Sequence, residues 1–100
     1  MTEEETISWI FLATVMATQN EPSNANGISM IADGINHDVP TQKELRVSFN
    51  WLIKNELLTR NGKKYSATPK GAAIYQNASK KTTNLIETWK ELEEKIKNYA

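Results

Sequence analysis

The residues from Thr41 to Asn55 constrain the fold of this chain more than any other stretch. Pro40 excludes helical dihedral angles from the residue before it, and Thr41 and Glu44 have the spacing of a capping box. The sequence therefore predicts a helix that begins at this point. On a helical wheel its apolar face is formed by Leu45, Phe49, Leu52 and Ile53, and the face roughly opposite carries Lys43, Arg46, Asn50 and Lys54. Such a helix packs one side on a core and presents the other to phosphates and base edges.

Length and composition indicate one small domain. The 100 residues, 39% of them hydrophobic, suffice for one modest core, and we expect a domain over 1–80 followed by a C-terminal helix over 81–100. The chain has no cysteine and no apolar run long enough to span a membrane. Its first residues are acidic, where a signal peptide would be basic. We therefore expect a cytoplasmic protein without membrane association.

Charge is segregated along the chain although the formal net charge is zero. Residues 1–42 contain six acidic side chains and neither lysine nor arginine. Residues 43–81 contain nine basic side chains and two acidic ones. A basic block within a neutral protein indicates a surface for a polyanion, and the alternative is a solvated surface on which the charges cluster by chance.

The N-terminal helix is expected to have two apolar stripes. A capping box at Thr2 and Glu5 predicts a helix from Glu3 to Thr18 or Gln19. One stripe contains Ile7, Ile10, Phe11 and Val15, and the second contains Trp9, Leu12 and Met16. Two stripes indicate two packing partners. The helix is therefore either the central helix of its own domain or a helix shared with a dimer interface.

A short helix is expected to precede the basic one. The composition of residues 21–27 predicts a loop, and the apolar spacing from Ile28 to Ile35 predicts a helix of two turns. Residues 36–40 then form a turn into the helix that Thr41 caps. Two helices joined by so short a turn predict a helix-turn-helix.

A hairpin and two further helices are expected after Asn55. Asn61-Gly62 predicts a type I′ turn between strands that carry Arg60, Lys63 and Lys64 near the tip. Thr68 and Pro69 predict the start of the next helix, and residues 79–83 predict a break.

The last predicted helix, from about residue 83 to residue 99, carries a heptad seam. The seam consists of Leu85, Trp89, Leu92, Ile96 and Tyr99. It is too short for an independent coiled coil, so it packs on the second stripe of the N-terminal helix, either in the same chain or across a dimer. We expect a homodimer, with an interface formed by Trp9, Leu12, Met16, Leu85, Trp89, Leu92, Ile96 and Tyr99.

This order of elements resembles the winged helix-turn-helix, and residues 41–71 are similar to its PadR-like and MarR-like bacterial regulators. The matching residues are Thr41, Leu45, Leu52, Leu57, Leu58, Gly62, Tyr65, Thr68 and Gly71. The resemblance implies a mainly α fold with a small β-hairpin, in which a three-helix core and a two-stranded wing are followed by a C-terminal dimerisation helix. It implies binding to double-stranded DNA, with Gln42, Lys43, Arg46 and Asn50 in the major groove, and Arg60, Lys63 and Lys64 as wing contacts. Lys54 belongs to the same basic face.

One departure from the family pattern concerns the end of the basic helix. Asn55-Glu56 stands where such proteins often have glycine. Either Asn55 adopts the left-handed conformation or the cap is strained.

Other functions have little support in the sequence. His37 is the only histidine, and a histidine in a turn near Asp33 and Asp38 is far more often a surface or capping residue than a catalytic base. A lone histidine without cysteine disfavours a metal site, and the four glycines are too dispersed for a phosphate-binding loop, so no cofactor is expected. The competing class is a winged helix that binds another protein and not DNA.

Overall fold

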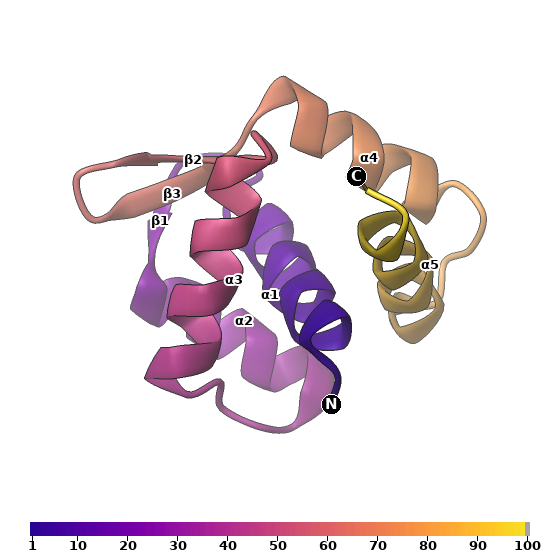
Figure 1. Ribbon diagram of the computed structural model, residues 1–100, viewed down its shortest axis with the longest axis horizontal. Coiled ribbons are helices and arrows are strands. Elements are labelled where there is room, and N and C mark those ends of the chain that lie inside the picture. The colour runs from indigo at the N-terminus through magenta and orange to yellow at the C-terminus, as the bar shows by residue number, and fades with distance from the viewer. Residues whose placement is uncertain (100) are drawn as a thin grey trace.

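Helix α1 lies in the middle of the molecule, and the other elements are arranged around it (Figure 1). The computed structural model describes residues 1–99. Its elements are α1 (Glu3–Ala17), β1 (Ser23–Asn24), α2 (Ala25–Asn36), α3 (Gln42–Lys54), β2 (Leu58–Asn61), β3 (Lys64–Ala67), α4 (Pro69–Ser79) and α5 (Leu85–Lys97). The strands form one small antiparallel sheet in the order β1-β3-β2. The prediction of a mainly helical fold with a small β-hairpin is confirmed.

Helix α1 begins with the predicted capping box. The Thr2 N–H donates to Glu5 Oε1 at 3.0 Å, and the Glu5 N–H donates to Thr2 Oγ1 at 3.1 Å. Every residue from 7 to 15 is buried, because α2 and α3 cover part of the helix and α5 covers another part. Both predicted apolar stripes are therefore used within one chain, and α1 is its central helix.

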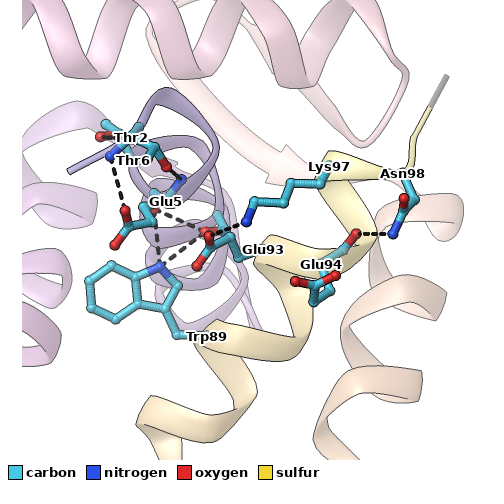
Figure 2. Close-up of polar contacts among 9 residues, drawn as sticks. Thr2, Glu5, Thr6, Trp89, Glu93, Glu94, Lys97 and Asn98 are labelled. Carbon is cyan, nitrogen blue, oxygen red and sulfur yellow. Dashed lines mark hydrogen bonds and ion pairs between the residues drawn. The ribbon is translucent and has the colours of Figure 1, made fainter.

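Two tryptophan indoles connect α1 to the helices beside it. The Trp9 indole N–H donates to the Ala32 carbonyl on α2 at 2.9 Å, inside the core. The Trp89 indole N–H, on α5, lies 3.0 Å from the Glu5 carbonyl (Figure 2). The same nitrogen lies 3.0 Å from Ser8 Oγ. The two rings are 6.3 Å apart between centroids. Each large apolar side chain thus has a partner for its one polar atom.

The α5 seam packs on α1 of its own chain, which is one of the two arrangements expected for it. Trp9, Leu12 and Leu92 have no exposed surface, and 4% of Ile96 is exposed. Met16, Trp89 and Tyr99 are half-buried against the same core, and Leu85 alone among the eight residues is exposed. These side chains are covered by their own chain because α1 has apolar residues around its circumference and α5 fills the second side. The seam packs in the same chain, so α5 shares the core of residues 1–80.

The loop predicted for residues 21–27 is shorter than expected. Ser23 and Asn24 form strand β1, and α2 begins at Ala25, three residues before the predicted start. The Asn24 side chain caps this helix by accepting from the Gly27 N–H at 2.9 Å. At the other end, the helix terminates at His37, which has a left-handed backbone with φ of 55°.

Helix α3 has the predicted start and an unexpected end. The Thr41–Glu44 capping box is confirmed, with N–H to side-chain oxygen distances of 2.9 and 3.0 Å. The left-handed residue at its C-terminus is Glu56, with φ of 64°, whereas Asn55 has φ of −92°. The Glu56 N–H donates to the Ile53 carbonyl and the Leu57 N–H donates to the Leu52 carbonyl, which is the pattern of a Schellman motif.

The hairpin turn is displaced by one residue from its predicted position. Asn61 pairs with Lys64, so Gly62 and Lys63 are the two loop residues. Within this turn only Gly62 has a positive φ, 65°. That corresponds to a type II′ turn, which needs a positive φ only at the first of its two central positions. The prediction of a type I′ turn is therefore wrong.

Thr68 closes the base of the hairpin and begins α4. Its N–H donates to the Leu57 carbonyl at 3.1 Å, and its hydroxyl donates to the Glu56 carbonyl at 2.6 Å. The same hydroxyl accepts from the Gly71 N–H at 3.0 Å, as the predicted N-cap requires. A Cβ on Gly71 would lie 2.1 Å from the Leu57 carbonyl oxygen, so only glycine permits this close approach. The predicted break between α4 and α5 is confirmed.

Candidate nucleic-acid interface

The outer face of α3 is exposed, and the inner face packs on the core. Its inner face is formed by Leu45, Ser48, Phe49 and Leu52, which are buried. Gln42, Lys43, Arg46, Asn50 and Lys54 are all exposed. At 3.6 residues per turn these five residues fall within an arc of about 120°, whose centre lies about 130° around the helix from the centre of the buried face. The structure therefore places all five predicted α3 residues together on one open surface.

Trp51, on the flank of α3 between its two faces, packs against the C-terminal part of the chain. It is half-buried, with its ring edge toward Tyr99 at a centroid distance of 5.9 Å and an interplanar angle of 65°. The Lys70 ammonium lies 5.1 Å from the centroid of the same Tyr99 ring. The C-terminal end of α5 thus covers the apolar flank of α3 and leaves the basic face open.

The β2–β3 hairpin projects beside α3 and carries the other three predicted residues (Figure 1). Arg60, Lys63 and Lys64 are exposed, and Lys63 lies in the turn itself. Arg60 is the most constrained of them. Its Nε donates to the Gly62 carbonyl at 2.7 Å, and its guanidinium lies 5.6 Å from the centroid of the Tyr65 ring. Arg60 therefore supports the hairpin tip in addition to presenting a charge.

The hairpin is attached to α3 through Tyr65. This ring stacks on Phe49, with centroids 4.0 Å apart and planes inclined by 13°. Arg60 lies over the Tyr65 ring, so a guanidinium and two aromatic rings connect the hairpin to the buried side of α3. This contact holds the basic residues of the hairpin in a fixed relation to those of α3.

Strand β1 contributes to this surface, although no strand is expected there from the sequence. Ser23 pairs with Tyr65 and Asn24 pairs with Lys64, so a third strand supports the hairpin. A hollow of about 420 Å³ lies between the hairpin and the first turn of α2, lined by Asn24, Ala25, Asn26, Arg60, Lys63 and Tyr65. The only sequence feature that indicates a structured segment here is the spacing of Asn24 and Gly27, which is typical of a helix N-cap.

Within residues 1–99 the basic side chains of this surface form no ion pair. In residues 1–99 the ion pairs are Lys81–Glu91 at 3.3 Å and Lys97–Glu93 at 3.1 Å, and both involve α5. Glu44 is on α3, but its carboxylate caps the helix and its position on the wheel lies outside the basic arc. The surface can therefore attract a polyanion.

The described part of the chain holds neither a metal-binding cluster nor a membrane-spanning helix. His37 ends α2 and is exposed at the turn, and no group of three His, Asp or Glu side chains within residues 1–99 could hold a metal ion. None of the helices that the structure describes has the length and apolar character required to cross a bilayer.

Comparisons with known proteins do not assign the chain to a family. No family model matches it, and neither the curated proteins nor the solved structures contain a match.

Proposed function

We propose that this chain is a winged helix-turn-helix protein that binds double-stranded DNA and regulates transcription. In this proposal α2 and α3 form the helix-turn-helix, α3 enters the major groove, and the β2–β3 hairpin is the wing that contacts the sugar-phosphate backbone. The observation that supports it most directly is the open face of α3, where five polar or basic side chains lie within one arc beside a basic hairpin.

Phosphate contacts would supply most of the affinity. Lys43 and Lys54 on α3 and Lys63 and Lys64 on the hairpin have no ion pair in residues 1–99. Each of these ammonium groups that reaches a phosphate releases condensed counterions, so affinity would fall steeply with salt concentration. The stack between Tyr65 and Phe49 would keep the two sets of contacts in register on the duplex.

Sequence recognition would depend on two side chains one turn apart. Arg46 and Asn50 are exposed on the same face of α3. An arginine in the major groove forms paired hydrogen bonds with guanine, and an asparagine does so with adenine. Gln42, near the start of the helix, lies on the same face and would contact base edges or phosphate.

Retention on heparin and a gel shift test this proposal. Wild-type protein should shift duplex DNA at low salt and release it at moderate salt. Lys43→Ala should lower the slope of log affinity against log salt by about 1, and Arg46→Glu should abolish the shift. Lys80→Ala is the matched control, because Lys80 is exposed in the turn after α4, away from both α3 and the hairpin.

A protein-binding role is the second candidate. It is favoured by the exposed apolar side chains Met30 and Val39, which lie close to the acidic Asp33 and Asp38 on and beside α2. If neither α3 substitution changes retention on heparin, the basic face is not the binding surface and this second candidate replaces DNA binding.

A further inference from the structure

The hollow between the hairpin and the first turn of α2, here called the β1 hollow, has a lining of one charge sign. Its volume of about 420 Å³ is within the range of sites for small ligands. One wall is formed by Asn24, Ala25 and Asn26, and the other by Arg60, Lys63 and Tyr65. Within residues 1–99 no acidic side chain lines it. The hollow therefore combines two positive charges with the amide groups of two asparagines.

The acidic side chains that are nearest in sequence lie toward the base of the hairpin. Glu21 precedes β1, and because β1 is antiparallel to β3 the chain before β1 leads away from the hairpin tip. Glu56 precedes β2 and so lies at the base as well. Neither Arg60 nor Lys63 forms an ion pair within residues 1–99. The positive charge of the hollow is thus uncompensated by the described chain.

The Arg60 guanidinium is already held in place on the hairpin wall. Its Nε donates to the Gly62 carbonyl at 2.7 Å, and its central carbon lies 5.6 Å from the centroid of the Tyr65 ring. Its terminal nitrogens form no hydrogen bond within residues 1–99 and can donate to the paired oxygens of an anion. A side chain that is already ordered loses less conformational freedom when it binds a ligand.

The asparagines of the other wall supply neutral donors. Asn24 Oδ1 accepts from the Gly27 N–H at 2.9 Å, so the oxygen is used by the helix cap and the NH₂ group is left as a donor. Asn26 is exposed on the first turn of α2, and its side-chain amide forms no hydrogen bond within residues 1–99. The cap already satisfies a backbone N–H at the start of α2, and the donors that face an anion here are side chains.

We infer that the β1 hollow binds a phosphate group between Arg60 and Lys63 on one wall and Asn24 and Asn26 on the other. Donors on two opposite walls suit a tetrahedral anion, which has oxygens on several sides, better than a carboxylate, whose two oxygens point one way. The group can belong to a nucleic-acid backbone or to a free phosphorylated molecule, because the recognition chemistry is the same. Binding of the phosphate itself does not rest on the proposed regulation of transcription.

Titration of the ¹⁵N-labelled whole chain with inorganic phosphate, followed by NMR at constant ionic strength, tests the inference. The resonances of the hollow should shift along one saturable curve with a dissociation constant of about 1 to 10 mM. These are the side-chain amides of Asn24 and Asn26, the Arg60 Nε–H and the Lys63 backbone N–H. Sodium acetate should bind at least about fivefold more weakly. The inference is overturned if these resonances show no saturable shift, or if acetate binds as tightly as phosphate.

Asn26→Asp separates binding in the hollow from general effects of charge. Aspartate is favourable in the first turn of a helix, so α2 should be retained, while the carboxylate repels the anion and should raise the dissociation constant at least about fivefold. Lys63→Ala, which removes a charge from the hairpin wall, should raise it at least about threefold.

Asn77→Asp is the matched control for the added charge. Asn77 is exposed on α4, which lies on the other side of α3 from the hairpin tip (Figure 1), so this variant should bind phosphate as wild type does. Equal affinities of Asn26→Asp and Asn77→Asp would overturn the inference. Well-dispersed spectra that match wild type outside the substituted site establish that the variants are folded.

A second titration, with a DNA duplex that has hydroxyl groups at its ends, identifies the source of the phosphate. A backbone phosphate is the ligand if the duplex shifts the resonances of the hollow and inorganic phosphate then shifts them no further. A free phosphorylated molecule is the ligand if the duplex leaves them in place and inorganic phosphate still shifts them. The proposed DNA binding fails separately, if the duplex leaves the amides of Arg46 and Asn50 on α3 unchanged.

Discussion

The ring of Tyr65 lies against the ring of Phe49, with 4.0 Å between centroids and 13° between planes. This contact joins the hairpin to α3 on the side away from the basic face. Tyr65→Ala should lower the free energy of unfolding by about 2 to 3 kcal/mol, through the lost stack and the lost apolar burial. Tyr65→Phe keeps the ring and should cost less than about 0.5 kcal/mol. Urea denaturation of both variants measures the difference, and equal losses would mean that the hydroxyl, not the ring, carries the contact.

Glu56 has a left-handed backbone that favours glycine. Glu56→Gly should therefore raise the free energy of unfolding by about 0.5 to 1 kcal/mol, the gain at the helix end exceeding the added entropy of the unfolded chain. Glu56→Ala removes the same carboxylate but keeps a Cβ, so it should not stabilise the protein. Thermal and urea unfolding of the pair separate backbone strain from charge. A stabilised alanine variant would show that the carboxylate was the unfavourable group.

Gly71 lies where the start of α4 meets the end of α3. Gly71→Ala places a Cβ 2.1 Å from the Leu57 carbonyl oxygen, and we expect a loss of more than about 3 kcal/mol. Gly34→Ala is the matched control, because Gly34 lies in the last turn of α2 and has nothing within 4 Å of an added Cβ. That variant should gain about 0.5 to 1 kcal/mol from helix propensity. A mild effect at Gly71 would mean that α4 can move away from Leu57 at little cost.

The capping box of α1 should make stability depend on pH. The hydrogen bond from the Thr2 N–H lowers the pKa of the Glu5 carboxyl below its ordinary value of 4.5. Because the pKa is lower in the folded state, the contribution is complete above pH 4.5 and is lost as the pH falls through the folded value. Glu5→Gln should keep the cap at neutral pH and show a smaller loss of stability on acidification. Urea denaturation between about pH 3 and about pH 6 measures the profile, and a Glu5→Gln variant with the wild-type profile would contradict this assignment.

The helix starts could be predicted from sequence because their chemistry is local. Thr2 with Glu5, Thr41 with Glu44, and Thr68 before Pro69 each satisfy backbone N–H groups only a few residues away, so the pattern is complete within one short stretch. For the same reason the amphipathic face of α3 was predictable. Once the apolar residues define the buried side of the helix, the residues on the other side are expected to be exposed.

Features that depend on a distant partner could not be predicted. Strand β1 is two residues long and exists because Ser23 and Asn24 meet β3, about 40 residues later in the chain. The seam of α5 has the same spacing whether it packs on α1 of its own chain or on another copy. The packing in the same chain depends on the contacts of Trp89 with Glu5 and Ser8. The spacing of apolar residues along the sequence does not indicate those contacts. Likewise, the left-handed residue is Glu56 and not Asn55, because the chain must turn at Glu56 to bring Leu57 into the core.

The hydrogen bond between the Thr68 N–H and the Leu57 carbonyl marks the base of the hairpin. Leu57 and Leu58 are anchored in the core below that bond, whereas Asn61, Gly62 and Lys63 beyond it are exposed. Residues added or exchanged at that tip would alter reach and charge without disturbing the interior. Related chains could therefore diverge in what they contact by varying a few tip residues while keeping one scaffold.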